Sequence, residues 1–567
     1  MSAGQEAVSQ RSRLARHVPG LALLRHYKRS WIRPDLAAGL ILAAILVPQG
    51  MAYAELAGLP AVTGLYTTVA CLVGYAFMGP SRILVLGPDS AVSPLILAAT
   101  LPLLGASGDP ATAIALAGML ALLVGAIEIG LGVAKLGFVA DLLSKEVQVG
   151  YMNGLGITII VSQLPKLCGF STDAEGFFEQ IGAFLSNLDE TNRITLALGL
   201  TTLLVLLVLP HVSRKLPAIL VAIVGATVAS AAFDLSARGV STVGSLPQGL
   251  PTPVMPWTQL SDVGPLLIAA IGITIVSLTD TIATSTSFAA RRGEEVDPDQ
   301  EMIGVGTANI AAGLFQGFAV SSSASRTAVA EQSKAKSQVT GLVGAGAVVL
   351  LLLFLNSLLA DLPQTVLAAV IMAAALSLID VPVLRRYWAV RRSALVLSVV
   401  ASAAVIILGV IQGIVAAISL SILLFFRRNW WPHGEVLGKV PSGGWHAVRD
   451  QASAVQVPGV VVFRWEAPLF FANVGIFRQQ VRSLARDESV TWIVLQCEAV
   501  TDIDITAADM IEQLSAELRK RGVHLRFVEM RTRLSEQMRR YGLLRTVDQN
   551  HLYGSIDAAV AAIKNSR

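Results

Sequence analysis

The sequence predicts a polytopic all-α membrane domain followed by a cytoplasmic α/β domain, and three observations support this fold class. The 567 residues are 54% hydrophobic and only 14% charged, and the mean hydropathy of +0.64 does not fit a soluble enzyme. Apolar stretches long enough to cross a bilayer recur up to residue 428. Beyond that residue the composition becomes that of an ordinary soluble domain.

Residues 1–34 form a predicted cytoplasmic segment, because basic side chains gather before the first apolar stretch. No short apolar core precedes residue 35, so we expect no cleavable signal peptide and a retained N-terminus. The basic residues of this segment are Arg11, Arg13, Arg16, Arg25, Lys28, Arg29 and Arg33.

The membrane domain, residues 35–428, contains about fourteen apolar stretches of spanning length. Several are short or interrupted by proline and glycine, so hydropathy alone would undercount them. The stretches begin near Asp35, Ala61, Gly87, Ala111, Asp141, Arg193, Leu216, Val263, Met302, Ser325, Val339, Gln364, Ser393 and Ile411.

The loop charges predict the orientation of these spans. If the N-terminus is cytoplasmic, the predicted outer loops hold little basic charge beyond Lys166, Arg193 and Arg238. This asymmetry is what the positive-inside rule requires, so we expect an inner (plasma) membrane protein with both termini in the cytoplasm. The basic residues of the predicted cytoplasmic loops are Arg82, Lys135, Lys145, Arg214, Lys215, Arg291, Arg292, Lys334, Lys336, Arg385, Arg386, Arg391 and Arg392.

Two breaks in the apolar pattern predict an anion site. Arg326 is the only charged residue between Glu301 and Glu331, and it follows the serine run 321–323. Irregular backbone at membrane depth is tolerated where it lines a cavity, and a helix starting near Ala324 would offer free N–H groups. The serines could instead serve helix packing and back-bonding to the helix, but the lone arginine in apolar sequence favours an anion site.

The first half of the chain contains a comparable break at residues 86–95, where we expect Gly87 and Pro88 to start a short helix that carries Ser90 and Ser93. Two breaks at corresponding positions suggest an inverted repeat with two half-helices at one midplane site.

Asp280 is the only charged residue between positions 263 and 290, within a run rich in hydroxyl side chains. An intramembrane carboxylate can take up a proton or bind Na⁺ together with nearby oxygens, and Thr284 would lie on the same helix face. The alternative is an internal salt bridge, with Arg326 as one partner.

The C-terminal region predicts a small α/β domain, residues 454–567, after a linker at residues 429–453. Strand-like runs at 459–465, 490–496 and 523–529 alternate with amphipathic stretches near 475–486, 506–521, 532–541 and 555–564. This order predicts a largely parallel sheet. We read Gly313 and Gly317 as a helix-packing pair and the three cysteines, Cys71, Cys168 and Cys497, as small core residues.

No nucleotide-binding, metalloprotease or zinc motif occurs in the sequence, so ATP-driven transport and hydrolytic or redox enzyme chemistry are not expected, and neither is a cofactor.

Residues 35–66, DLAAGLILAAILVPQGMAYAELAGLPAVTGLY, resemble the opening signature of the SulP (solute carrier 26) family of anion transporters. Residues 287–333 resemble the signature of its second repeat, and the C-terminal region resembles its STAS domain. The resemblance implies two inverted seven-helix repeats, a core domain that moves against a gate domain in elevator fashion, and a homodimer. It covers essentially the whole chain.

The resemblance also implies functional residues. Asp280 and Thr284 match the positions where sodium-coupled bicarbonate members place ion ligands, whereas proton-coupled members tend to have Glu at the Asp280 position. Asp89 departs from the uncharged residue of many relatives, and it could cap its helix, form a structural pair or be a second protonation site. The resemblance places the substrate site on Gln49, Tyr53, Gly87, Pro88, Asp89, Ser90, Ala91, Ser325 and Arg326, and we add Ser323 from the serine run.

Thr506 occupies the position at which STAS relatives among anti-sigma-factor antagonists are phosphorylated. Asp504 and Thr506 could equally serve as helix caps.

Together these observations predict a secondary active transporter of sulfate, bicarbonate or a dicarboxylate, coupled to H⁺ or Na⁺. The alternatives are an uncoupled anion channel or exchanger, and a sensor that signals through its STAS domain. The expected partners are a small anion, membrane lipid, a second copy of the chain and a cytoplasmic protein on the STAS domain, with no nucleic acid.

Overall fold

The computed structural model describes residues 18–104, 108–172, 174, 176–213, 217–355, 359–430, 432, 434–543 and 552–565. The chain divides into two compact units, Met1–Ser421 and Ile422–Arg567, each considered by itself below. Half of the predicted N-terminal segment, residues 1–17, and the loop residues Arg214 and Lys215 lie outside the described part. The rest of that segment contains α2 (Pro19–Arg25), which packs on α4.

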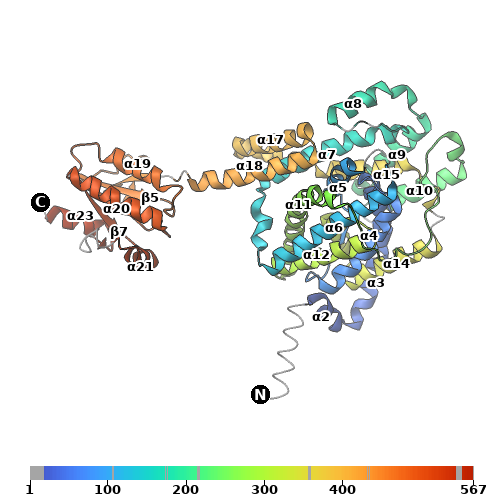
Figure 1. Cartoon of the computed structure of the whole chain (residues 1–567), viewed down its shortest axis with the longest axis horizontal. Helices are drawn as coiled ribbons and strands as arrows, with labels where there is room; N and C mark the ends of the chain where they lie inside the picture. The colour runs from blue at the N-terminus through green and yellow to red at the C-terminus, as the bar shows by residue number, and fades with distance from the viewer. Residues whose placement is uncertain are drawn as a thin grey trace, which may run out of the picture. The chain divides into compact units, whose positions relative to one another are not determined.

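The first unit has the predicted all-α architecture, and each predicted span corresponds to one helix within the described residues (Figure 1). In the part of the chain that the structure describes, six helical segments are long and apolar enough to cross a membrane, and five more are shorter apolar helices. The helices are α3 (Ile32–Leu56), α4 (Ala61–Met78), α5 (Ser93–Thr100), α6 (Pro110–Val133), α7 (Lys145–Cys168), α9 (Arg193–Val212), α10 (Ala218–Ala232), α11 (Leu260–Arg292), α12 (Pro298–Leu314), α13 (Ala324–Gln332), α14 (Val339–Phe354), α15 (Gln364–Leu378), α17 (Arg392–Leu408) and α18 (Val410–Trp430).

The packing of these helices shows the inverted repeat, because contacts occur in exchanged pairs. If α3 corresponds to α11, α4 to α12 and α6 to α14, then the contact of α14 with α4 mirrors that of α6 with α12. The contacts of α15 with α9 and of α17 with α7 are related in the same way. Two helix groups result: a core built from α3–α6 and α11–α14, and a gate built from α7, α9, α10, α15 and α17. α18 packs closely on α17, because a Cβ on Gly413 would lie 2.6 Å from the Val405 Cα.

Close helix approach in the core depends on glycine. In Figure 1, α6 runs alongside α12, and a Cβ on Gly306 would lie 2.7 Å from the Gly125 carbonyl oxygen. A Cβ on Gly313 would lie 2.6 Å from the Gly118 carbonyl oxygen, so the predicted packing role of Gly313 is confirmed. The two helices touch through their backbones, which fixes the wall behind the candidate site.

The first short helix begins later than the sequence predicts. Gly87 belongs to the two-residue strand β1 (Leu86–Gly87), residues 88–92 form a turn, and α5 starts only at Ser93. Pro94, rather than Pro88, lies in the first helical turn, where its missing N–H costs no hydrogen bond. Ser90 therefore lies before the helix, not on it.

Two further helices connect spans of the gate. α8 (Phe177–Ser186) lies between α7 and α9, and α16 (Val381–Val390) lies between α15 and α17. Neither helix has a fully buried residue. They occupy corresponding positions in the two repeats, which again agrees with the internal symmetry.

The second unit contains a six-stranded sheet with strand order β4-β3-β5-β6-β7-β8. The run from β5 to β8 is parallel, as predicted, and β3 and β4 add an antiparallel edge. The elements are β3 (Gly434–Lys439), β4 (Trp445–Ala447), β5 (Val460–Trp465), α19 (Val474–Leu484), β6 (Trp492–Gln496), α20 (Ile505–Lys520), β7 (His524–Val528), α21 (Thr532–Arg540), β8 (Leu552–Tyr553) and α23 (Ile556–Asn565).

The predicted linker, residues 429–453, contains β3 and β4, and α18 continues through Trp430. Val436 and Leu437 of β3 pair with Phe463 and Val462 of β5, so the sheet begins well before residue 454. Glycine at positions 434 and 438 leaves no regular apolar alternation, so this segment carries no clear strand signal.

Candidate anion site between two short helices

The candidate site is centred on a short antiparallel strand pair inside the core. β1 pairs with β2 (Ser321–Ser322) in the register Leu86↔Ser322 and Gly87↔Ser321. Each strand leads into a short helix, so we call residues 86–100 the α5 arm and residues 321–332 the α13 arm. The first turns of both helices lie close to this strand pair, where their free N–H groups favour an anion.

Arg326 connects the two arms. Its side chain is 1% exposed, Nη1 donates to the Pro88 carbonyl oxygen at 2.5 Å, and Nη2 lies 3.4 Å from the Gly87 carbonyl oxygen. A Cβ at Gly87 would lie 3.1 Å from Nη1, so glycine leaves room for the guanidinium. The guanidinium that we expected to bind an anion thus already donates hydrogen bonds to carbonyl oxygens of the α5 arm. Nε remains buried without a partner among the described residues.

The serines of the α13 arm have different environments. Ser323 is the N-cap of α13, and its Oγ accepts a bond from the Arg326 backbone N–H at 3.5 Å and lies 3.0 Å from the Ser325 Oγ. Ser325 is exposed, whereas Ser321 and Ser322 are buried. The Ser322 hydroxyl has no partner among the described residues. Hydroxyl donors are therefore available at the start of this helix.

Asp89 contacts a residue of each arm. Its Oδ2 accepts a bond from the Ala91 N–H at 2.9 Å, and its Oδ1 lies 4.0 Å from Arg326 Nη2. The predicted structural pair is therefore present, whereas the predicted cap is not: the bond to Ala91 lies in the turn before α5, whose N-cap is Val92 without a side-chain cap bond. Arg326 forms this ion pair with Asp89, so the proposed salt bridge between Arg326 and Asp280 does not occur in the described structure.

Gln49 and Tyr53 lie one turn apart on α3, which contacts both α5 and α13. Both side chains are almost fully buried. The Tyr53 hydroxyl interacts with the Ser90 side chain, and the Gln49 Oε1 has no partner among the described residues. Ala91 is buried beside Ser90. The structure thus brings the predicted substrate residues of α3 and of the α5 arm together.

Asp280 and Thr284 lie on α11, as predicted. Asp280 is within electrostatic range of both Asp89 and Arg326, while Thr284 is buried. Between them in sequence, Thr281 accepts a bond from the Ser322 N–H at 3.2 Å, so α11 also supports β2. The described residues contain no group of three or more His, Cys, Asp or Glu side chains arranged to hold a metal.

Three buried carboxyl groups were missed by the sequence analysis. Asp35, Glu128 and Glu301 are each 0% exposed. Asp35 accepts bonds from the Ser337 hydroxyl and from backbone at the start of α14, and Glu301 accepts bonds from the Tyr75 and Ser81 hydroxyls. Glu128 had a detectable signal, because it is the single charged residue of the 24-residue helix α6.

In the second unit, Asp504 is the N-cap of α20 and accepts the Ala507 N–H at 2.7 Å, which confirms one of its predicted roles. Thr506 is exposed on the first turn of that helix, and its phosphorylation stays a prediction.

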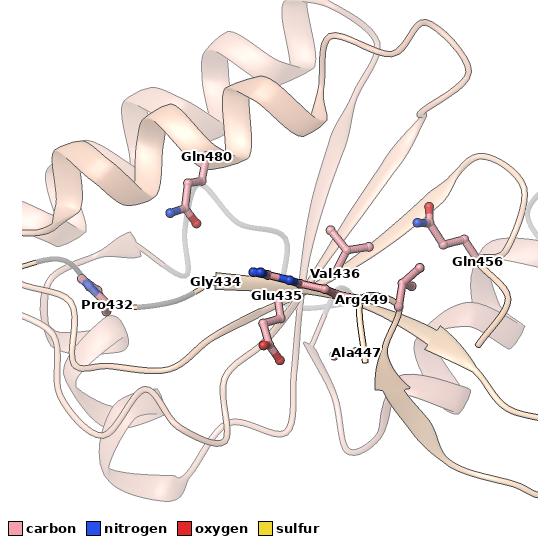
Figure 2. Close-up of a pocket in the computed structure, with 9 residues that line it drawn as sticks. Pro432, Gly434, Glu435, Val436, Ala447, Arg449, Gln456 and Gln480 are labelled. Carbon is pink, nitrogen blue, oxygen red and sulfur yellow. The ribbon is translucent and has the colours of Figure 1, made fainter. Parts of the chain in front are cut away.

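The same unit has an open pocket of about 640 Å³ between β3, β4 and α19. Figure 2 shows the side chains of Arg449, Glu435 and Gln480 at this pocket. Arg449 and Glu435 are the charged residues that line it.

Comparison with known proteins agrees with these observations. The model of the sulfate permease family matches residues 32–401, and that of the STAS domain matches residues 451–559. A probable sulfate transporter of Mycobacterium tuberculosis is 41% identical over 549 residues, which cover 96% of this chain and 98% of that protein. Human solute carrier family 26 member 6 is 33% identical over 494 residues, which cover 83% of this chain and 65% of that protein.

Solved structures show the same architecture. The murine anion transporter Slc26a9 in its inward-facing state matches with a TM-score of 0.90 at 26% identity, over 98% of this chain and 95% of that one. The transmembrane domain of the cyanobacterial bicarbonate transporter BicA matches with a TM-score of 0.60 at 24% identity, over 70% of this chain and 97% of that one. The second match shows likeness of fold alone.

Proposed function

The chain belongs to the sulfate permease family of membrane anion transporters, and we propose that it carries a small oxyanion by secondary active transport coupled to H⁺ or Na⁺. Sulfate is the first candidate, since the M. tuberculosis relative is described as a probable sulfate transporter. Bicarbonate and dicarboxylates remain further candidates, because backbone amides, hydroxyls and a guanidinium bind many oxyanions nearly alike.

The observation that carries this proposal is the placement of Arg326 at the junction of two helix N-termini, with the Asp280 carboxylate within electrostatic range. The anion would contact the first turns of α5 and α13, with Ser323, Ser325 and Tyr53 as hydroxyl donors. The cation would be taken up at Asp280. Opposite charges in one poorly solvated site attract each other strongly, so each ligand raises the affinity for the other.

The side chains of Asp280 and Thr284 offer a cation only oxygen ligands, a carboxylate and a hydroxyl. This donor set suits a proton or Na⁺, and a Na⁺ ion would need further oxygens from backbone or water. We therefore propose the position of the coupling ion without choosing its identity.

All of the proposed site residues lie on core elements: α3, the α5 arm, α11 and the α13 arm. None lies on a gate helix. This separation supports elevator-type alternating access, in which the core carries the site as a rigid body past the gate. A homodimer would give the gate a fixed partner.

The decisive experiment is uptake of labelled sulfate, bicarbonate, fumarate and chloride into proteoliposomes with imposed H⁺ or Na⁺ gradients. We expect one anion to accumulate against its own gradient, driven by one of the two cations. Asp280→Asn should abolish gradient-driven accumulation while reducing anion binding much less. Asp262→Asn is the matched control, because Asp262 is a partly exposed residue in the first turn of the same helix.

Accumulation separates this proposal from its alternatives. A channel cannot concentrate an anion, and an exchanger requires a trapped counter-anion rather than a cation gradient. Wild-type rate and gradient dependence in the Asp280→Asn variant would show that the coupling assignment is wrong.

A further inference from the structure

A buried polar cluster in the core lies beside the candidate site and has no role in the proposed transport cycle. Its members are Glu128 on α6, Ser277 on α11, Asn309 on α12 and the backbone of Val320 just before β2, and all four residues are 0% exposed. Glu128 lies within hydrogen-bonding distance of Ser277 and Asn309, both of which are neutral. An ionised carboxylate held only by neutral groups in a dry membrane interior is costly.

Five polar contacts connect the four groups. The Asn309 Nδ2 lies 2.8 Å from Glu128 Oε2 and 3.3 Å from the Val320 carbonyl oxygen, and the Val320 N–H donates to Asn309 Oδ1 at 2.7 Å. The Ser277 Oγ lies 3.0 Å from Glu128 Oε1 and 3.4 Å from the same Val320 oxygen.

These contacts require one more hydrogen than an ionised cluster contains. Asn309 supplies two hydrogens, the Val320 N–H supplies one and the Ser277 hydroxyl supplies one, so four hydrogens must serve five contacts. A fifth hydrogen on Glu128 removes the deficit, because the carboxylic acid can donate to Ser277 Oγ and the Ser277 hydroxyl can then donate to Val320. Each of the five contacts then has a hydrogen of its own.

We infer that Glu128 is a resident carboxylic acid whose proton completes the network that holds β2, and that it acts as a positioning residue for the α13 arm. The segment leading into β2 is held from several sides. Thr67 accepts the Phe318 N–H at 3.1 Å, Asn309 contacts both backbone groups of Val320, and Thr281 accepts the Ser322 N–H. Glu128 orients Asn309 and Ser277, and so acts through them.

The role that we infer for Glu128 differs from the coupling role proposed for Asp280. Asp280 is within electrostatic range of the ion pair of Asp89 and Arg326, where a cation can come and go. Glu128 bonds only to neutral groups in the described structure and sits behind β2. We therefore expect Glu128 to keep its proton throughout the transport cycle.

Glu128→Gln tests this directly, since the glutamine amide can donate to Ser277 while its carbonyl accepts from Asn309. We expect sulfate uptake with a KM within about twofold of wild type and unchanged gradient dependence. Glu128→Ala removes the connection and should raise the KM about tenfold, the effect of losing one buried hydrogen bond. Should Glu128→Ala fail to fold, Ser277→Ala breaks the same connection and should raise the KM in the same direction.

Infrared spectroscopy provides a readout that a merely structural side chain would not give. The wild-type spectrum should contain a carboxylic acid carbonyl band that disappears in Glu128→Gln and shifts in Ser277→Ala, because the acid loses its acceptor. Glu301→Gln is the control, since Glu301 is buried elsewhere and bonds to Tyr75 and Ser81. The band assigned to Glu128 should survive that change.

Two results would overturn the inference. Loss of a carboxylate band, rather than an acid band, in Glu128→Gln would show that Glu128 is ionised. Loss of sulfate uptake in Glu128→Gln despite the acid band would show that the carboxyl does more than position β2. The KM arm rests on the proposed function, but the infrared arm does not, so a wrong substrate or coupling assignment would leave the infrared result intact.

Discussion

The α5 arm and the α13 arm each consist of a two-residue strand followed by a short helix, yet they present different groups to each other. The α5 arm turns the carbonyl oxygens of Gly87 and Pro88 and the Asp89 carboxylate toward its partner. The α13 arm presents the Arg326 guanidinium and an N-cap serine, Ser323. One arm supplies acceptors and a negative charge, and the other supplies donors and a positive charge.

This difference shows how two copies of one topology can build a single asymmetric site. If both arms presented acceptors, their meeting point would repel an anion, and if both carried arginine, the two cations would repel each other. The observed division lets the arms attract each other while the helix N-termini keep N–H groups for a substrate. The α13 arm should therefore determine anion binding, and the α5 arm should adjust it.

Arg326→Ala breaks this division most severely. The change removes the single cation of the α13 arm and leaves the carbonyl oxygens of Gly87 and Pro88 without their donor. We expect sulfate uptake to fall by about two orders of magnitude or more, the range for truncating one partner of a buried charged pair. Uptake in proteoliposomes and sulfate binding by calorimetry would both measure it.

Arg326→Lys is the matched variant, because it keeps the charge but cannot contact two carbonyl oxygens with a planar fork. Its uptake should lie between those of wild type and Arg326→Ala. Equal uptake by the alanine variant and wild type would mean that the anion does not depend on the α13 arm.

Asp89→Asn should change the site less and in the opposite direction. The amide oxygen can still accept the Ala91 N–H, so the turn before α5 is kept, but the negative charge 4.0 Å from Arg326 Nη2 is removed. An anion then no longer competes with a resident carboxylate, and we expect the KM for sulfate to fall by about threefold to tenfold, a fraction of the Coulomb energy of such a pair at high effective dielectric.

The same variant distinguishes the roles considered for Asp89. If this carboxylate were a coupling site, Asp89→Asn would lose accumulation against a gradient, whatever its KM. Retained accumulation with a lower KM would support the structural ion pair alone.

The sequence predicted the number and order of the spans well, because an apolar stretch bounded by charged loops has few alternatives in a bilayer. It also located both arms, since Arg326 and the Gly87–Pro88 break are local signals. It did not predict that Arg326 would contact the Pro88 carbonyl oxygen, because that contact depends on a strand pair between residues more than 200 positions apart.

Glu128 and β3 were not predicted from the sequence, for two different physical reasons. Glu128 was overlooked because its hydrogen-bond partners come from two helices far away in sequence, so its place in a network was invisible. β3 was assigned to the linker because its glycines and short length give no alternation, and its pairing with β5 supplies the stability that its own sequence lacks.

The smallest expected effect concerns the support of β2 from α11. Thr281 is 0% exposed and its hydroxyl accepts the Ser322 N–H at 3.2 Å, so Thr281→Val leaves one buried backbone donor without its partner while keeping the side-chain shape. We expect the KM for sulfate to rise about threefold to fivefold, because a single hydrogen bond behind the α13 arm is lost.

Thr274→Val is the matched control on the same helix, since Thr274 is also buried but its hydroxyl has no partner among the described residues. The control should leave the KM unchanged. If both variants behave like wild type, the α13 arm tolerates loss of this hydrogen bond, and the support of β2 by Thr281 is not needed for binding.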